Sequence, residues 1–271
     1  MLMTAPSTAL TLTVGRFLAF DTSTDRMSIG VSDGTQQWLH EGAGGPLSST
    51  SLIPAIMQLL ANADLRLDQL DAIAFGRGPG SFTGLRTACA VAQGLALGAG
   101  VPVLPVDSLL ALAEEARFQW ALNNSAPQTI TAMLDARMDE MYVQHFHLTG
   151  GVCQAIAPCV LVRPEAFELS AVRPATGDSV SQAKPVQHGL AGNVFEVYAT
   201  RLPSPPPSCT RLTALPSAAA MLRLAPSMLA AGAAREASQA LPLYIRDKVA
   251  LTTDERAELK RRTLLERIEP S

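Results

Sequence analysis

The chain has 271 residues, of which 48% are hydrophobic, 17% are charged and only 5% are aromatic. This composition is typical of a soluble globular protein with a core of small aliphatic side chains, and the length allows one large domain or two smaller lobes. The net charge of −3 and the pI near 5.8 exclude a broad nucleic-acid-binding surface.

The four cysteines include no CxxC pair, which disfavours a zinc ribbon and a thioredoxin-type site. We expect reduced thiols in a cytoplasmic protein. No stretch reaches the roughly 18 apolar residues of a membrane span, and residues 1–16 lack the basic start of a signal peptide. We therefore expect no contact with a membrane and interpret residues 1–16 as a disordered leader.

Three strands precede the first helix. Apolar or alternating runs predict them over residues 17–20, 27–32 and 36–41, and Asp33-Gly34 is a hairpin signal between the last two. Three consecutive strands without an intervening helix predict an antiparallel meander.

Helices and strands then alternate. Ser51 is a candidate N-cap for a helix over residues 51–63, which would place Pro54 in its first turn. The other elements of the first half are a strand, a helix and a strand, predicted over residues 71–75, 82–97 and 101–106.

The second half repeats the β-β-β-α-β pattern less clearly, after a helix over residues 108–120 and a hinge over 123–128. Its further strands and helices are predicted over residues 129–135, 140–148, 152–162, 186–190, 194–200 and 216–229. Four prolines mark residues 202–207 as a linker. Residues 241–249 are predicted to be extended, and residues 252–268 to be a charged helix or a disordered tail.

The repetition predicts a duplicated α/β fold of two lobes, each built on a β-β-β-α-β-α pattern. We assign residues 17–106 together with 213–238 to lobe I, which we expect to bind a partner, and residues 107–212 to lobe II. Residues 239–271 are then an extended C-terminal segment and tail.

A glycine-rich loop connects the strand at 71–75 to the helix at 82–97. Gly76, Gly78 and Gly80 permit close approaches that a Cβ would prevent. A strand, a glycine loop and a helix N-terminus can together bind an anion. The alternatives are that the loop contacts a protein or only turns the chain.

The same loop also fits a dinucleotide-binding pattern. Gly78, Gly80 and Gly84 have a related spacing, Ser81 is a candidate N-cap, and Asp107 ends the following strand, where a ribose-binding acid would stand. Such a unit usually opens its domain, whereas a three-strand meander precedes it here, so this interpretation is the weaker one.

Three other polar groups are candidate ligand residues. The turn that begins at Asp21 follows a buried strand and either holds a metal or phosphate or only caps the chain. His145 and His147 share one face of a strand, but a metal site needs a third ligand. Residues 135–140 form a charged turn that either clamps a substrate or pairs with itself. The candidate ligand residues of these loops are Asp21, Thr22, Ser23, Arg77, Gly78, Gly80, Thr83, Arg86, Asp135 and Arg137.

Two helices carry more apolar surface than one sheet contact needs. The helix over 51–63 is apolar on most sides. On the helix over 82–97, small residues recur every fourth position, at Gly84, Ala88 and Ala92, and such a ridge lets another helix approach closely. Both helices are therefore predicted to be buried, by their own core or by a partner.

Four sequence blocks, at residues 17–23, 76–86 with 92–96, 135–142 and 243–249, closely resemble the TsaB (YeaZ) family. The resemblance implies an actin-like/Hsp70-like (ASKHA) fold of two lobes. It also implies the pathway that makes N6-threonylcarbamoyladenosine at position 37 of ANN-reading tRNAs, in which this family is the non-catalytic partner. Its partners would be the catalytic paralogue TsaD and the small ATPase TsaE, with tRNA contacted indirectly through the complex.

The residues at two sites agree with the non-catalytic role that the resemblance implies. The paralogue carries a His-Met-Glu-Gly-His metal motif where this chain has residues 108–112, so Ser108 and Leu112 stand in place of the two histidines, and neither side chain can replace imidazole. The paralogue's second phosphate loop corresponds to Asp135-Ala-Arg137, where an acid would repel phosphate. We therefore expect no cofactor in this chain alone, and ATP or ADP only in the complex.

The resemblance assigns the two apolar helices to a four-helix interface, with TsaD in the complex or with a second copy in a homodimer. The interface residues predicted in this way are Leu52, Ile53, Ile56, Met57, Leu60, Ser81, Phe82, Gly84, Leu85, Ala88, Cys89 and Ala92. Many family members have a His near the start of the first helix, where Ser49 stands here. The remaining alternative is a metal- or nucleotide-dependent enzyme of the same superfamily, glycopeptidase-like or sugar-kinase-like.

Overall fold

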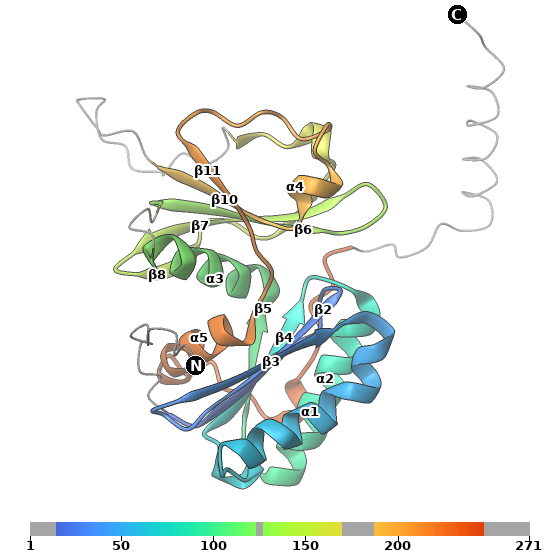
Figure 1. Cartoon of the computed structure of the whole chain (residues 1–271), viewed down its shortest axis with the longest axis vertical. Helices are drawn as coiled ribbons and strands as arrows, with labels where there is room; N and C mark the ends of the chain where they lie inside the picture. The colour runs from blue at the N-terminus through green and yellow to red at the C-terminus, as the bar shows by residue number, and fades with distance from the viewer. Residues whose placement is uncertain (1–14, 123–126, 170–186, 247–271) are drawn as a thin grey trace, which may run out of the picture.

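The computed structural model describes residues 15–122, 127–169 and 187–246. These residues form two lobes, with the helices α3 (Ser108–Leu122) and α5 (Ala218–Ala230) lying between the two sheets (Figure 1). The predictions for the leader up to residue 14, for the hinge at 123–126 and for the tail over 252–268 lie outside the described residues.

Lobe I is built on a five-stranded sheet. Its strands are β1 (Phe17–Asp21), β2 (Arg26–Ser32), β3 (Gln37–Ala43), β4 (Ala72–Gly78) and β5 (Val103–Asp107). They lie in the order β3-β2-β1-β4-β5, with β1, β2 and β3 antiparallel to one another and β4 and β5 parallel to β1. The predicted hairpin is present, and Gly34 adopts the positive φ of 97° that its turn requires.

Lobe II is built on a second sheet with the same topology. Its strands are β6 (Thr129–Asp135), β7 (Met141–Thr149), β8 (Val152–Ala155), β9 (Val160–Val162), β10 (His188–Gly192) and β11 (Cys209–Thr213). The order β11-β10-β6-β7-β8 repeats that of lobe I, with an antiparallel meander followed by two parallel strands. The duplicated, two-lobed α/β fold predicted from the sequence is confirmed.

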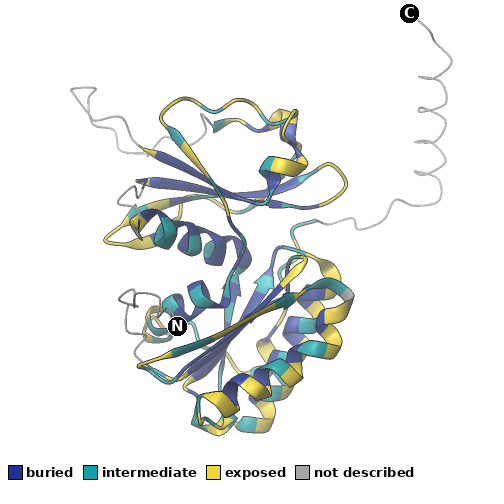
Figure 2. Cartoon of the chain, viewed as in Figure 1, coloured by how far each residue is buried: buried dark blue, intermediate teal, exposed yellow. Residues whose placement is uncertain are grey.

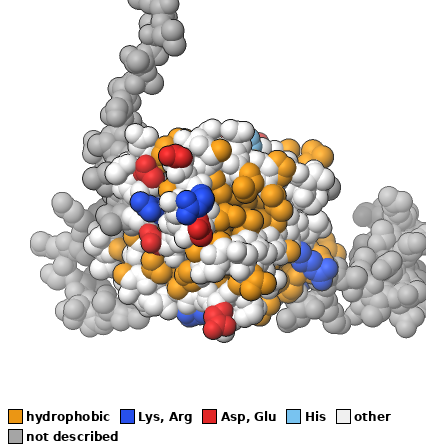
Figure 3. Space-filling model, turned by 90° about the horizontal axis from the view of Figure 1, so that it is seen from below, with side chains coloured by type: hydrophobic (Ala, Val, Ile, Leu, Met, Phe, Trp, Pro, Cys, Tyr) orange, Lys and Arg blue, Asp and Glu red, His pale blue; other side chains and the backbone are white. Residues whose placement is uncertain are grey.

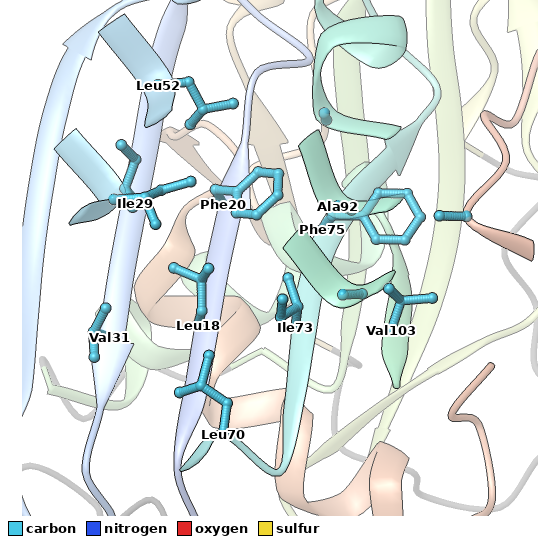
Figure 4. Packing of buried hydrophobic residues seen from close by; sticks show 14 of the residues in the cluster. Leu18, Phe20, Ile29, Val31, Leu52, Leu70, Ile73, Phe75, Ala92 and Val103 are labelled. Carbon is cyan, nitrogen blue, oxygen red and sulfur yellow. The ribbon is translucent and has the colours of Figure 1, made fainter. Parts of the chain in front are cut away.

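Helices cover both faces of the lobe I sheet. α1 (Ser48–Asn62) and α2 (Phe82–Ala99) lie on one face and α5 on the other. Side chains of β1 alternate between the two cores, with Leu18 and Phe20 facing α1 and α2 while Phe17 and Ala19 face α5. Figure 4 shows Leu18 and Phe20 beside Ile73 and Phe75 of β4. Burial on both faces explains why β1 is a continuous apolar run.

The helix that follows the last strand of each lobe packs on the sheet of the other lobe. α3 follows β5 of lobe I but packs on β6 of lobe II, and α5 follows β11 of lobe II but packs on β1 and β2 of lobe I. α4 (Val194–Val197) lies on the outer face of lobe II (Figure 1). No helix among the described residues is long and apolar enough to cross a membrane.

Several predicted boundaries are wrong. α1 begins at Ser48 and not at Ser51, because the short 3-10 helix over Gly45–Leu47 leads directly into it, so Pro54 lies inside the helix. The predicted strand over 152–162 is divided into β8 and β9, α4 ends before residue 200, and β11 was not predicted. The four cysteines are all unpaired.

Candidate functional site

A cavity of about 470 Å³ lies between the two lobes. On the side of lobe I it is lined by the turn after β1, the loop before α1 and the N-terminus of α2. On the side of lobe II it is lined by the turn after β6, by Tyr142 and by Asn193, and residues 243–246 close a further wall. Most of the loops that the sequence singled out therefore meet here.

Asp21 ends β1 but is buried away from this cavity. Its carboxylate accepts hydrogen bonds from the Ser23 amide at 2.8 Å, the Ser23 hydroxyl at 2.6 Å and the Ser108 hydroxyl at 3.2 Å. Burial raises the pKa of Asp21, and these hydrogen bonds oppose that shift. A Cβ at Gly76 would overlap this carboxylate. Asp21 is thus a fully partnered buried acid, as in the capping alternative, and Gly76 makes room for it.

The glycine loop packs against the turn after β1. The Ser81 amide donates to the carbonyl of Ser23 at 2.7 Å, and a Cβ at Gly80 would lie 2.5 Å from that same oxygen. Thr22 donates from its hydroxyl to the carbonyl of Gly84 at 2.7 Å. Ser81 stands at the N-cap of α2, but its side chain makes no capping hydrogen bond, so that part of the prediction is wrong.

The other side of the glycine loop contacts the C-terminal segment. The amide of Leu243 donates to the carbonyl of Arg77 at 2.7 Å, and a Cβ at Gly78 would lie 2.7 Å from the carbonyl of Leu243. Protein backbone thus occupies the space that a phosphate would need. The glycines permit close packing within the chain, and the Arg77 guanidinium pairs with Asp107 at 2.5 Å.

The charges of the turn after β6 are paired, within the turn between Asp135 and Arg137 and outside it with Arg201 and Arg246. Asp135 accepts from the Tyr198 hydroxyl at 2.8 Å and from the amide of Arg137 at 2.9 Å, and it forms an ion pair with the Arg137 guanidinium at 3.1 Å. Arg137, Met138 and Asp139 have φ values of 60°, 55° and 60°, a left-handed conformation that is unfavourable for side chains other than glycine. The structure therefore favours the self-paired turn over the substrate clamp.

Residues 241–246, which we name the strap, connect the two lobes beside the cavity. Tyr244 stacks on Phe82 with ring centroids 5.2 Å apart, and the Arg86 guanidinium lies 3.8 Å from the centroid of the Phe82 ring. Arg246 donates to Glu140 at 2.5 Å and to the carbonyl of Arg137 at 3.2 Å. The strap thus holds the turn after β6 close to the N-terminus of α2.

The histidines predicted as candidate metal ligands face different surroundings. The Thr131 hydroxyl lies 2.8 Å from both His145 Nδ1 and His188 Nε2, while His147 is exposed. Burial lowers the pKa of His145, and burial together with His145 lowers the pKa of His188 to about 4. Within the described ranges, no three His, Cys, Asp or Glu side chains are grouped closely enough to hold a metal.

The predicted partner interface needs correction. Eight of its residues are buried within lobe I and cannot contact a partner: Leu52, Ile56, Leu60, Gly84, Leu85, Ala88, Cys89 and Ala92. The sheet of lobe I covers this face of α1 and α2, including the ridge of small residues. Ile53, Met57, Ser81 and Phe82 are exposed, and so is the candidate ligand residue Thr83.

The solvent-facing sides of α1 and α2, which we name the α1–α2 face, carry little charge. α1 contains no charged residue and α2 contains only Arg86. The exposed positions are visible along both helices in Figure 2, and those of α2 include Phe82, Ala90, Gly94 and Leu97. A Cβ at Gly94 would meet no atom within 4 Å, so packing inside the chain does not require glycine there.

The end of lobe I farthest from lobe II continues this surface. Hydrophobic side chains gather there beside acidic and basic ones (Figure 3). A shallow groove at the C-terminus of α2 is lined by Leu97, Pro102 and residues 234–238. Leu97 is 78% exposed, so the apolar character of the α1–α2 face extends to the end of α2.

Known proteins of similar length resemble this chain in sequence and architecture. The E. coli K12 protein named tRNA threonylcarbamoyladenosine biosynthesis protein TsaB is 31% identical over 245 residues, which cover 87% of this chain and 96% of the relative. The structure of YeaZ from Pseudomonas aeruginosa is 34% identical and covers 85% of this chain and 99% of its own, with a TM-score of 0.69. The chain belongs to the TsaB (YeaZ) family.

Other comparisons agree with this membership. Residues 45–254 match the family model described as "TsaD: tRNA N6-adenosine threonylcarbamoyltransferase". A TsaB protein of Haemophilus influenzae is 43% identical over 126 residues, an alignment that covers 46% of this chain and 51% of the relative. A second Pseudomonas aeruginosa structure, described as similar to peptidase YEAZ, is 34% identical and covers 86% of this chain and 100% of its own, with a TM-score of 0.71. The resemblance deduced from the four sequence blocks is confirmed.

Some residues that line the cavity were not predicted as site residues. Tyr142 lies at the end of the block at 135–142, and Tyr244 and Arg246 lie in the block at 243–249. The signal was therefore present in the blocks that carry the family resemblance. Only the meeting of the two lobes assigns these side chains to the cavity.

Proposed function

We propose that the chain is a non-catalytic subunit of the machinery that installs N6-threonylcarbamoyladenosine at position 37 of ANN-decoding tRNAs. The E. coli relative, aligned over nearly its whole length, is named as a protein of threonylcarbamoyladenosine biosynthesis. In this proposal the chain acts in the cytoplasm, activates the catalytic paralogue TsaD, works with the ATPase TsaE and contacts tRNA through the complex.

The surroundings of two positions support a non-catalytic role. Ser108 and Leu112 stand where the paralogue carries its two metal-binding histidines. Ser108 is fully buried and donates to Asp21, and Leu112 lies in the core that α3 forms with the lobe II sheet. Neither side chain lines the cavity between the lobes. These two positions therefore supply no side chain that could bind the metal of a metal-dependent transferase.

The observation that carries the proposal is the α1–α2 face. The two neighbouring helices expose Ile53, Met57 and Phe82, and together they contain one charged residue. The solvent-facing side of helices in an isolated domain is usually rich in charged residues. We propose that TsaD covers this face in the complex and that a second copy covers it in a homodimer. The two assemblies then compete, because they use the same surface.

Reconstitution tests this function. The full chain, its TsaD and TsaE partners and an ANN-reading tRNA are combined with threonylcarbamoyl-adenylate, and modified tRNA is quantified with and without the chain. We expect modification to require all components and the lone chain to produce none. Transferase activity of the lone chain would instead support the alternative of a superfamily enzyme, and full modification without the chain would refute the proposed role.

A further inference from the structure

The cavity between the lobes has the dimensions of a small-molecule site. Its volume of about 470 Å³ falls within the range of roughly 300–1,000 Å³ that such sites occupy. Its walls combine aliphatic side chains, among them Leu134 and Ile245, with the aromatic rings of Phe82 and Tyr244. The cavity shares Phe82 with the α1–α2 face, but its other walls lie between the lobes, so its occupant can be tested separately from the proposed function.

Tyr142 supplies an unused hydrogen-bond donor to this cavity. The residue is only 7% exposed, it lines the cavity, and its hydroxyl bonds to no other described residue. In the described part of the chain, every side-chain nitrogen or oxygen that is fully shielded from solvent has a hydrogen-bond partner. The Tyr142 oxygen is therefore not fully shielded, and we infer that it faces the cavity that this residue lines. A phenol in this position donates to whatever occupies the space.

Aromatic stacking provides the second element of recognition. The Phe82 and Tyr244 rings stack at the cavity wall. The Arg86 guanidinium contacts the Phe82 ring, and Arg86 Nε also donates to the Tyr244 hydroxyl at 3.3 Å. Tyr244 remains 44% exposed, so part of its ring is available to a further planar group. Stacking on a fixed aromatic ring is favourable for any planar ring and needs no particular sequence of polar contacts.

The charges of the cavity disfavour phosphate. The amides of Ser81 and Arg137 already donate to Ser23 and Asp135. The wall carries the carboxylates of Asp25 and Asp135 and the guanidiniums of Arg137 and Arg246, which are paired with Asp135 and Glu140. An uncharged ligand avoids these carboxylates, whereas a triphosphate meets a wall with no net positive charge.

We propose that the cavity binds an uncharged small aromatic molecule whose ring stacks beside Tyr244 and whose hydrogen-bond acceptor faces the Tyr142 hydroxyl. Adenosine and N-acetyltryptophanamide represent two sources of such a ring. ATP carries the same ring as adenosine and differs by its phosphates, so the pair isolates the effect of charge.

Saturation-transfer NMR with the full chain measures the three affinities. We expect saturable binding of at least one uncharged probe with a Kd of about 1 mM or below, and ATP weaker than adenosine by about tenfold or more. Tyr142→Phe should weaken binding of the probe about fivefold while the melting temperature stays the same, because the hydroxyl makes no hydrogen bond to the described residues. Tyr244→Ala should weaken it further, and Leu97→Ala at the far end of lobe I should have no effect.

Three results obtained with the chain alone would overturn the proposal. They are the absence of saturable binding for both uncharged probes, ATP binding as tightly as adenosine, and unchanged affinity in both Tyr142→Phe and Tyr244→Ala. TsaD is then added to the chain with bound probe. If TsaD does not displace the probe and the two variants still weaken probe binding, the cavity binds a small molecule and not a side chain of the partner. Displacement of the probe by TsaD would assign the cavity to the partner and refute the small-molecule proposal.

Discussion

Arg223 of α5 and Glu114 of α3 form an ion pair at 2.9 Å in which the side chains are only 10% and 4% exposed. Arg223 also pairs with Glu115 at 2.8 Å, and Glu114 pairs with Arg117 at 2.6 Å. Burial alone would raise the pKa of Glu115, but hydrogen bonds from Gln119 and Ser217 and the charge of Arg223 hold it below its ordinary value. This network joins the two helices that lie between the lobes.

Removing Arg223 should be costly, because two buried carboxylates lose a partner. We expect Arg223→Met to lower the free energy of unfolding by about 3 kcal/mol, measured by urea denaturation. Arg66→Met is the control, because Arg66 forms an exposed pair with Asp68 and its removal should leave the free energy of unfolding nearly unchanged. Equal effects of the two substitutions would contradict the buried network.

Two glycines of α2 should respond oppositely to alanine. A Cβ at Gly84 would overlap the carbonyl of Thr22, whereas a Cβ at Gly94 meets no atom within 4 Å. We expect Gly84→Ala to destabilise the chain by about 2 kcal/mol through overpacking, and Gly94→Ala to stabilise it by up to about 1 kcal/mol through helix propensity. Urea midpoints of the two variants check this, and a shift of the same sign in both would show that the packing of α2 is misassigned.

The α1–α2 face should be sensitive to charge without affecting the fold. Met57→Arg and Gly94→Arg place a cation on exposed positions, so we expect a folded chain that forms neither homodimer nor TsaD complex, measured by light scattering after size exclusion. Val160→Arg, on the exposed side of lobe II, should leave both assemblies intact. Leu85→Arg and Ala88→Arg are unsuitable tests, because they bury the charge in the core of lobe I. Assemblies that survive both Met57→Arg and Gly94→Arg would place the interface elsewhere.

His188 should make stability depend on pH. Its folded pKa of about 4 lies below the ordinary value of 6.5, so the unfolded chain takes up a proton first as the pH falls. The stabilisation is complete above pH 6.5 and is lost as the pH falls toward 4, by at most about 3 kcal/mol. His188→Gln should flatten this slope, whereas His40→Gln, at an exposed position, should not. The free energy of unfolding is measured between pH 7.5 and 4.5. An unchanged dependence of this free energy on pH in His188→Gln would contradict the assignment.

Local signals predicted much of the fold. The apolar run of β1, the Asp33-Gly34 turn and the strand–loop–helix unit around Gly78 are encoded by neighbouring residues, and all three are present. β11 is short, contains Arg211 and is positioned only by pairing with β10, so it has little local signal. The start of α1 was missed because no side chain caps it.

The site was predicted less completely, because its properties depend on contacts between distant segments. The sequence indicated that Gly78 and Gly80 permit a close approach, but only the structure shows that Leu243 and Ser23 make it. Likewise, Ile53 and Ile56 are equally apolar, and the position of the sheet decides which one is exposed.

The exchange of α3 and α5 between the lobes has a consequence for how the chain can be divided. A fragment that ended after β5 would lack the helix that covers the Phe17 and Ala19 side of its sheet, because that helix comes from the other end of the sequence. In a domain-swapped dimer, each subunit gives one element to the other. The two lobes exchange helices in the same way, but within a single polypeptide. Neither half is therefore an autonomous folding unit. A chain cut at residue 107 should expose an apolar sheet face in the first fragment and the apolar side of α5 in the second, and both should aggregate.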